Sequence, residues 1–434
     1  MPQRPARLLK CSCAALFLMT QASFVSAAPP VLDPVLDADP FTTESLFAHP
    51  PKRFDAALRH YLRGVEAASR LDEKTAQREL AAAYQDPHAT PQIAGRALAL
   101  AGNTALRAGD YRRAADLLDR AISEYGTSLN DVARETTDQN RGAAMALRDE
   151  PAQSVERHVA GTIALAINDL GLTTGPAVIE GHDQVAVIDT GASASVLSTT
   201  AAKQLGVRIL SRKTVTGSST ATVESVMAMA DTVRFGTMTL HHVAFIVLPD
   251  AALSPLGPEH RIDAIIGFPV LAALGRVTFR EEAGTPPRRS LSFAPSPARV
   301  RPGNLRFVET DPFLRVGLSS AVGDQSLPLA VDSGSNTTYF GKRYAREFSA
   351  RIAGLEKRTT KTIGAGGAEQ RQAAVIPSLD IAVGATHVTL TRVSIDLEGN
   401  GSENLYGTIG ADLLWAKGGY TIDFGALELS LGAR

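Results

Sequence analysis

Val185-Ala186-Val187-Ile188-Asp189-Thr190-Gly191 is an apolar run that ends in an acidic turn, and Leu329-Ala330-Val331-Asp332-Ser333-Gly334 repeats the arrangement. Each apolar run has the length and composition of a buried strand. Small residues follow each aspartate, as a sharp turn beneath a carboxylate requires. A single Asp-Thr-Gly is most often an ordinary turn in which glycine takes a positive φ. The two copies therefore indicate a functional site only if their surroundings also repeat.

The surroundings do repeat. Ile265-Ile266-Gly267 and Thr408-Ile409-Gly410 follow their aspartates at the same distance along the chain, because the interval from 189 to 267 equals that from 332 to 410. Between these landmarks each half carries a turn rich in Gly, Ser and Thr, at 216–220 and 363–367. The halves differ in spacing around these turns, as loops differ on a shared framework.

This set of landmarks resembles the pepsin and retropepsin superfamily of aspartic peptidases, over about residues 160 to 434. The resemblance implies two β-rich acid-protease-type lobes with pseudo-twofold symmetry, each giving one aspartate to a shared cleft. It implies that Asp189 and Asp332 are catalytic. It implies that the active-site loops are supported by Thr190, Gly191, Ser333 and Gly334. The implied flaps, which would close over an extended peptide, contain Gly217, Ser218, Gly364 and Gly366.

The expected chemistry needs two carboxyl groups close together. Like charges about 3 Å apart cannot both ionise, so the pair shares one proton. The ionised member takes a proton from water, while the protonated member donates to the substrate carbonyl. We expect no covalent intermediate and no cofactor.

Several residues depart from the pattern of the superfamily. The first flap lacks the tyrosine that pepsin-type flaps carry, and Asn336 stands where Ser or Thr is more usual. Phe268-Pro269 follows Gly267 where a polar residue is frequent in retropepsin-like chains. None of these departures removes a proton-transfer group.

Composition bounds the other functions. The 434 residues include 44 Lys and Arg against 45 Asp and Glu, for a net charge of −1. The basic residues are scattered, so we expect no nucleic-acid partner. His241 and His242 are adjacent on a predicted strand and should point to opposite faces, so no metal site is expected. Residues 364–367 lack the Gly-Lys that a phosphate loop requires.

Residues 1–27 have the pattern of a signal peptide. Basic residues precede an apolar run at 13–19, and Val25-Ser26-Ala27 offers a small-residue cleavage site. We expect an exported protein, in a bacterial periplasm or secreted, with no membrane attachment after cleavage. An uncleaved anchor is the alternative. Both cysteines, Cys11 and Cys13, lie in this segment, so the cleaved protein has no disulfide.

Residues 28–155 are predicted to form a linker and a helical domain. From about Thr42 to Arg148 the apolar residues recur at intervals of three and four. The part from Ala97 to Ile122, with a turn at Gly109, resembles one tetratricopeptide unit. A plain helical bundle is the alternative. The two lobes are expected at 156–300 and 301–434, joined by a segment rich in proline.

The sequence therefore predicts a monomeric aspartic endopeptidase that acts on polypeptides, with a protein partner or a regulatory role for the helical domain. The alternative is a peptide-binding or scaffold protein that keeps the protease fold but does not hydrolyse. A third hypothesis is a zymogen-like arrangement in which the helical domain blocks the cleft.

Overall fold

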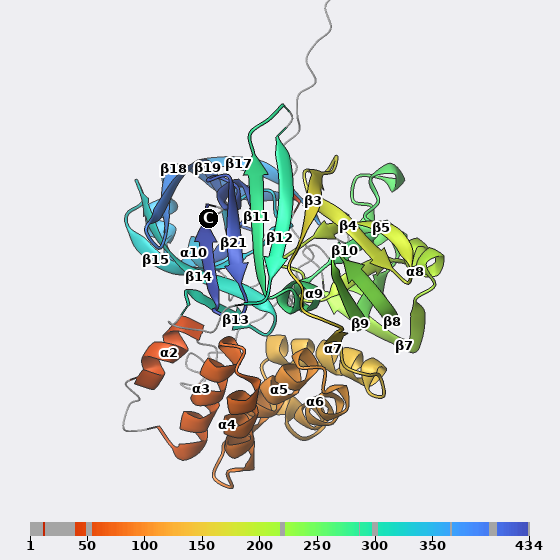
Figure 1. Cartoon of the computed structure of the whole chain (residues 1–434). Coiled ribbons are helices and arrows are strands. Elements are labelled where there is room, and N and C mark those ends of the chain that lie inside the picture. The colour runs from red at the N-terminus through yellow and green to blue at the C-terminus, as the bar shows by residue number, and fades with distance from the viewer. Residues whose placement is uncertain are drawn as a thin grey trace, which may run out of the picture.

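The computed structural model describes residues 12–13, 40–48, 54–217, 222–285, 287–296, 303–364, 367–398 and 406–432. Helices form the first part of the chain, and strands curl into two lobes in the rest (Figure 1). The helices lie along one side of the pair of lobes. No helix in these ranges is long and apolar enough to cross a membrane.

The predicted helical interval is confirmed. Polar residues before five of its helices accept a hydrogen bond from the backbone N–H three positions on, as N-caps do. A Cβ on Gly102 would lie 2.5 Å from Leu118 Cγ, so glycine allows close helix contact there. The elements are α2 (Pro40–Ala48), α3 (Ala56–Ser69), α4 (Glu73–Gln85), α5 (Pro91–Arg107), α6 (Tyr111–Tyr125), η1 (Gly126–Ser128) and α7 (Asp131–Leu147). Their tetratricopeptide character stays a prediction.

The first lobe is built mainly of strands, which are joined by short helices. Its elements are β2 (Ser154–Val155), β3 (Gly161–Ile167), β4 (Thr173–Ile179), β5 (His182–Ile188), β6 (Ser195–Ser198), α8 (Thr199–Leu205), β7 (Arg208–Gly217), β8 (Thr222–Phe235), β9 (Met238–Leu248), η2 (Asp250–Leu253), η3 (Pro258–His260), β10 (Ala264–Ile266), α9 (Phe268–Ala273), β11 (Arg276–Glu282) and β12 (Arg288–Ala294). The predicted hairpin before Asp189 forms from β4 and β5, with Glu180 and Gly181 at positive φ in its turn.

The second lobe repeats most of this order. Its elements are β13 (Leu305–Val308), β14 (Asp311–Ser320), β15 (Gln325–Val331), β16 (Tyr339–Phe340), α10 (Lys342–Glu347), α11 (Ser349–Ile352), β17 (Glu356–Gly364), β18 (Gly367–Val383), β19 (Thr386–Asp396), β20 (Gly407–Ile409), α12 (Ala411–Leu414), β21 (Gly419–Asp423) and β22 (Glu428–Leu431). The elements that follow the two hydrophobic-Gly landmarks are a short helix and then a hairpin in each lobe.

Strand pairings recur between the lobes at matching places. Strand β5 pairs in parallel with β10, and β15 pairs in parallel with β20. Each of β10 and β20 then pairs antiparallel with the short strand that follows the aspartate turn, β6 or β16. The register matches, because Ile188 lies opposite Ile266 and Val331 lies opposite Ile409. Both aspartates therefore leave a strand whose parallel neighbour runs into the hydrophobic-Gly landmark.

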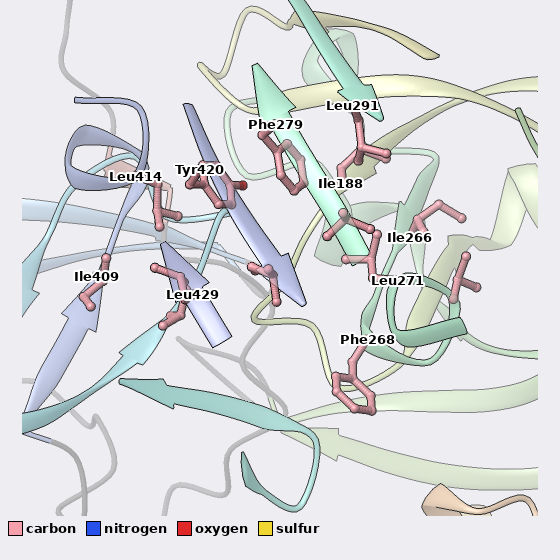
Figure 2. Close-up of a cluster of buried hydrophobic side chains, with 14 of the residues drawn as sticks. Ile188, Ile266, Phe268, Leu271, Phe279, Leu291, Ile409, Leu414, Tyr420 and Leu429 are labelled. Atoms are coloured by element: carbon pink, nitrogen blue, oxygen red, sulfur yellow. The ribbon is translucent and has the colours of Figure 1, made fainter. Parts of the chain in front are cut away.

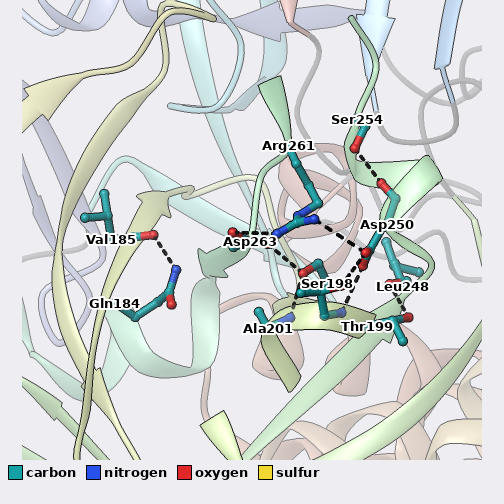
Figure 3. Close-up of polar contacts among 11 residues, drawn as sticks. Gln184, Val185, Ser198, Thr199, Ala201, Leu248, Asp250, Ser254, Arg261 and Asp263 are labelled. Carbon is teal, nitrogen blue, oxygen red and sulfur yellow. Dashed lines mark hydrogen bonds and ion pairs between the residues drawn. The ribbon is translucent and has the colours of Figure 1, made fainter. Parts of the chain in front are cut away.

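A polar cluster holds the β6–α8 corner of the first lobe (Figure 3). Ser198 Oγ accepts from Ala201 N at 3.0 Å, which caps α8, and donates to Asp263 Oδ1 at 2.7 Å. Arg261 Nε donates to the same Asp263 oxygen at 2.6 Å. Because Asp263 immediately precedes β10, these contacts fix the strand that lies beside Asp189.

The lobes are joined by strands and by an apolar core. Strand β11 of the first lobe pairs antiparallel with β21 of the second, and Thr278 lies opposite Thr421 with their hydroxyls 3.0 Å apart. Figure 2 shows Phe279 and Tyr420 between the apolar side chains of the two lobes, and their rings stack at 4.3 Å. Phe268 lies edge-on to Phe307 and to Phe424 of the second lobe, at 5.4 and 5.8 Å.

Other sequence expectations have mixed outcomes. The φ of His242 is +56°, and its ring centroid lies 6.2 Å from that of His241, so the expectation that the pair faces opposite sides of a regular strand is wrong. Strand β2 already pairs with β9 before residue 156. Most of the predicted signal peptide and linker lies outside the described residues; β1 (Ser12–Cys13) pairs with β17. The domain boundaries stay predictions.

Phe268→Ala tests the contact between the lobes. Removing this ring, which is 4% exposed, should lower the free energy of unfolding by about 3–5 kcal/mol, as for other buried aromatic truncations. Val185→Ala is the control, because Val185 is 66% exposed and its loss should change stability by about 0.5 kcal/mol or less. Equal midpoints for both variants in urea denaturation would contradict the packing role of Phe268.

Candidate active site

The structure brings the two predicted catalytic aspartates together. Asp189 follows β5 and Asp332 follows β15. The backbone N–H of Asp189 donates to Ile266 O, and that of Asp332 donates to Ile409 O, both at 3.0 Å. The neighbouring strand thus holds each aspartate at the end of its own strand. The two carboxyl groups meet within hydrogen-bonding reach of each other at the junction of the lobes.

Backbone donors in the turns orient each carboxyl group. Gly191 N donates to Asp189 Oδ1 at 2.9 Å. Gly334 N and Ser335 N donate to Asp332 Oδ1 at 2.8 and 3.1 Å. The Asp332 Oδ2 atom is buried without a well-aligned partner. It is therefore the oxygen of Asp332 left free of backbone donors.

Thr190 and Ser333 bind each other's loop. Thr190 N donates to Ser333 Oγ, and Ser333 N donates to Thr190 Oγ1, both at 3.0 Å. Each hydroxyl then donates to a carbonyl across the lobe interface: Ser333 Oγ to Ile188 O at 3.0 Å, and Thr190 Oγ1 to Val331 O at 3.4 Å. This reciprocal set lies in the position that the sequence assigned to loop support.

Position 191 has room only for glycine. A Cβ at this position would lie 2.7 Å from Asp332 Cγ, closer than any ordinary contact. The backbone of the first loop therefore passes directly against the carboxyl group of the second lobe. Gly334 contributes a backbone donor to the same pair.

Burial shifts the protonation of both carboxyl groups. Asp189 is 1% exposed and Asp332 is fully buried. Burial raises the pKa of Asp189 to about 6, against the lowering effect of donors that include Gly191 N. Burial and the neighbouring charge of Asp189 raise the pKa of Asp332 well above its usual range. The pair therefore holds one proton over a range of pH, with Asp189 as the member that ionises first.

The predicted flaps are hairpins. Strands β7 and β8 are paired up to Gly217 and Thr222, and β17 and β18 are paired up to Gly364 and Gly367. Ser218 and Gly366 lie outside the described residues. Ile363, near the end of β17, belongs to the same buried cluster as Val187 and Ala192, which flank Asp189. The second hairpin thus reaches apolar residues of the first lobe.

Residues 175–270 match the model of a family described as aspartyl protease. The matched segment contains Asp189 and Gly267 and ends before the second lobe. The first lobe is therefore similar to aspartyl proteases, which supports a peptidase.

A solved structure of a retropepsin-like aspartic protease from Rickettsia conorii is 18% identical to this chain. The alignment covers 32% of this chain and 95% of that one, with a TM-score of 0.21, too low to establish a shared fold. No curated protein matches the sequence.

Two of the three departures from the aspartic peptidase pattern have structural explanations. Asn336 Nδ2 donates to Leu170 O at 2.9 Å, so it ties the second aspartate turn to a loop of the first lobe. Phe268 N donates to Ala192 O at 2.8 Å while its ring enters the core between the lobes. Both residues therefore link the halves rather than disturb the aspartate loops.

Sequence reasoning missed a pair of supporting hydroxyls. Ser195 Oγ accepts from Gly267 N at 3.2 Å, and Thr338 Oγ1 accepts from Gly410 N at 3.1 Å. The signal was present, because the interval from Ser195 to Thr338 equals the interval from Thr190 to Ser333.

Sequence reasoning also missed residues that adjoin the pair from more distant elements. Tyr420 lies beneath the loops with its buried hydroxyl toward Ser333, though without a well-aligned hydrogen bond, and burial raises its pKa. Asp311 is buried near Asp189, and no pattern in the sequence singles it out.

Ser333→Ala tests the bracing of the loops. The change leaves the buried Thr190 N–H without its acceptor, so the free energy of unfolding should fall by about 1–3 kcal/mol. Ser333→Thr keeps the hydroxyl and is the matched control. Chemical denaturation measures the free energy of unfolding of both variants. A decrease that is no larger for Ser333→Ala than for Ser333→Thr would count against the bracing role.

Proposed function

We propose that the protein is an aspartic endopeptidase that hydrolyses polypeptides with water activated between Asp189 and Asp332. The observation that carries the proposal is the meeting of two buried carboxyl groups, one from each lobe. Burial with a like-charged neighbour favours a shared proton, which is the state this chemistry needs. The similarity of the first lobe to aspartyl proteases supports the same reaction.

The two aspartates take different roles in this proposal. Asp189, with its pKa of about 6, is the ionised member and accepts a proton from the attacking water. Asp332 has the higher pKa and gives its proton to the carbonyl oxygen of the peptide bond as the carbon becomes tetrahedral. Asp189 then gives the proton it took from water to the amide nitrogen, Asp332 takes a proton back from a hydroxyl of the tetrahedral carbon, and the C–N bond breaks. The products are a carboxylic acid and an amine, and no covalent bond to the protein forms.

We propose that the lobes are related by a pseudo-twofold axis. It would pass between Thr190 and Ser333 and between Thr278 and Thr421, because the members of each pair contact each other and stand at the same interval in the chain. The β7–β8 and β17–β18 hairpins act as flaps in this arrangement. An extended peptide would pair with them through main-chain hydrogen bonds.

Three further proposals rest on the sequence. Residues 1–27 direct export to a bacterial periplasm or the exterior and are then removed, which would also remove β1. The protein works as a monomer, since one chain supplies both aspartates. The helical domain is tetratricopeptide-like and binds a partner or regulates the cleft.

A peptide-binding protein without hydrolysis is the alternative function. Its support is the burial of both carboxyl groups in the described conformation, which leaves a substrate no direct access to them. Peptide binding without cleavage at any pH would favour this alternative.

Asp189→Asn and Asp332→Asn test the proposed pair. Each variant loses a proton-transfer group, so kcat on an unfolded protein substrate should fall by about 10²–10⁴-fold. Asp149→Asn is the control, since Asp149 is exposed and pairs with the exposed Arg112 of the helical domain. Activity that survives in either dyad variant would remove that aspartate from the mechanism.

The raised pKa values predict a pH dependence of both activity and stability. Activity should increase as the pH rises through about 6, where Asp189 ionises, and should fall at a higher pH where Asp332 loses its proton. A carboxyl group whose pKa is raised by folding stabilises the protein most at low pH. The contribution of Asp189 should therefore be lost as the pH rises from about 4 through about 6.

Urea denaturation across this range, with the wild type beside Asp189→Asn, isolates the contribution of Asp189 to stability. As the pH rises, the free energy of unfolding of the wild type should fall relative to that of Asp189→Asn. A difference that is constant with pH would contradict the raised pKa.

A further inference from the structure

A cavity of about 280 Å³ lies between the helical domain and the lobes. Helices α5, α6 and α7 form one side. The other sides come from the segment just after the Asp189 turn, from strands β8 and β9, from α9, and from the β13–β14 turn of the second lobe. Its lining includes Ser193 and Ala194, close after Asp189 in the chain, and Glu309. Its size suits one or two side chains rather than a drug-sized ligand.

Amide groups of the helices hold Glu309 in the lining of this cavity. Asn103 Nδ2 on α5 donates to Glu309 Oε1 at 2.6 Å, and Asn140 Nδ2 on α7 donates to Oε2 at 3.2 Å. Asn140 Nδ2 also lies 3.1 Å from Asn103 Oδ1. Both carboxyl oxygens are therefore fixed in place by neutral donors.

The nearby cation makes no hydrogen bond to this carboxyl group. Arg107 lines the cavity, but its Nε and Nη2 donate to Glu73 at 2.9 Å each, and Nη2 also donates to Ala68 O. Its remaining Nη1 donates to the backbone carbonyl of Glu309. Burial raises the pKa of Glu309, and the positive charge of Arg107 and the two asparagine amides act against that rise.

A second carboxyl group lies near Glu309. Asp311 is 6% exposed, and its Oδ1 is buried with no hydrogen-bond partner. Burial raises the pKa of Asp311, and the charges of Glu309 and Asp189 raise it further, which favours the neutral form. Asp311 is therefore a neighbour of both Glu309 and Asp189.

Glu309 also adopts an unfavourable backbone conformation. Its φ is +55°, in the left-handed region that glycine tolerates best. Glycine in this two-residue hairpin turn would relieve the strain. The side chain at this position is fixed by the two asparagines.

The rest of the lining combines polar and apolar side chains. Met227, Ile246 and Phe268 of the first lobe and Leu106 and Leu147 of the helices are apolar, whereas Thr136, Gln139, Gln153 and Ser193 are polar. Apolar side chains beside a fixed carboxyl group match a lysine side chain, which has a hydrocarbon stem and a charged end.

We propose that this cavity is a substrate subsite that receives a lysine side chain of the polypeptide, with its ammonium group bound by Glu309. The inference rests on the proposed peptidase function and names the residue that the helical domain helps to recognise. It makes the helices part of the substrate site.

The test uses the full chain and two matched peptide libraries. Both libraries have blocked α-amino groups, and in one of them the lysines are acetylated, which removes the charge but keeps the stem. The wild type should cleave the unmodified library about tenfold faster, a difference of about 1.4 kcal/mol, with lysine enriched at one fixed distance from the cut. Mass spectrometry of the products measures both quantities.

Glu309→Gln should abolish the enrichment of lysine and the difference between the libraries. Glu124→Gln is the matched control, because Glu124 is exposed and pairs with Arg120 on the surface of α6, and it should keep both. Wild-type cleavage without any preference for lysine would overturn the proposal, and this comparison needs no variant to fold. Persistence of the preference in Glu309→Gln would also overturn it.

Binding separates this proposal from hydrolysis itself. The same libraries are passed over immobilised wild-type and Glu309→Gln protein. If neither library is cleaved, selective retention of unmodified lysine peptides by the wild type alone still supports the subsite while the peptidase function fails. Equal retention of the two libraries overturns the subsite.

Discussion

The structure depends on the exchange of hydrogen bonds between Thr190 and Ser333. Two buried carboxyl groups with like charge repel each other when both are ionised, and only a rigid support keeps them side by side. Each loop supplies a hydroxyl and a backbone N–H to the other, and each hydroxyl donates onward to the strand that leads into the opposite loop. The support is therefore shared by the lobes, so neither aspartate is positioned by its own half alone. A change in one loop should be felt at both carboxyl groups.

The apolar contacts below these loops serve the same requirement. Phe279 and Tyr420 stack where β11 meets β21, and Phe268 inserts between Phe307 and Phe424. An aromatic residue at position 268 departs from the retropepsin-like pattern, but it fills the contact between the lobes. Phe268 thus makes the sequence less like the retropepsin-like pattern but stabilises the packing between the lobes, because buried aromatic area is a large source of stability.

The helical domain is bound to both lobes by specific polar contacts. Asn103 and Asn140 hold the Glu309 carboxylate, Gln153 after α7 donates to Pro269 O of the first lobe, and Arg306 of the second lobe bonds with Glu44 of α2. Fixed contacts of this kind keep the cavity between the helices and the lobes in one shape. Because the helices contribute part of its wall, a subsite here would add selectivity that the two lobes alone do not carry. The helical domain has no proposed proton-transfer group, so its proposed contribution is to substrate selection.

The sequence by itself determined the two aspartate turns, the strands that lead into them and the supporting roles expected for Thr190 and Ser333. These features are readable because each depends on a short local pattern, and a constant interval in the chain relates one copy to the other. Only the tertiary structure placed Tyr420 beneath the loops, Asn336 against Leu170, and Asp311 near both Asp189 and Glu309. Likewise, nothing in the sequence near residue 309 indicated contacts with two helices from the other end of the chain. Such neighbours are set by how distant elements pack, and burial, which shifts the pKa of each carboxyl group, arises only once that packing is complete.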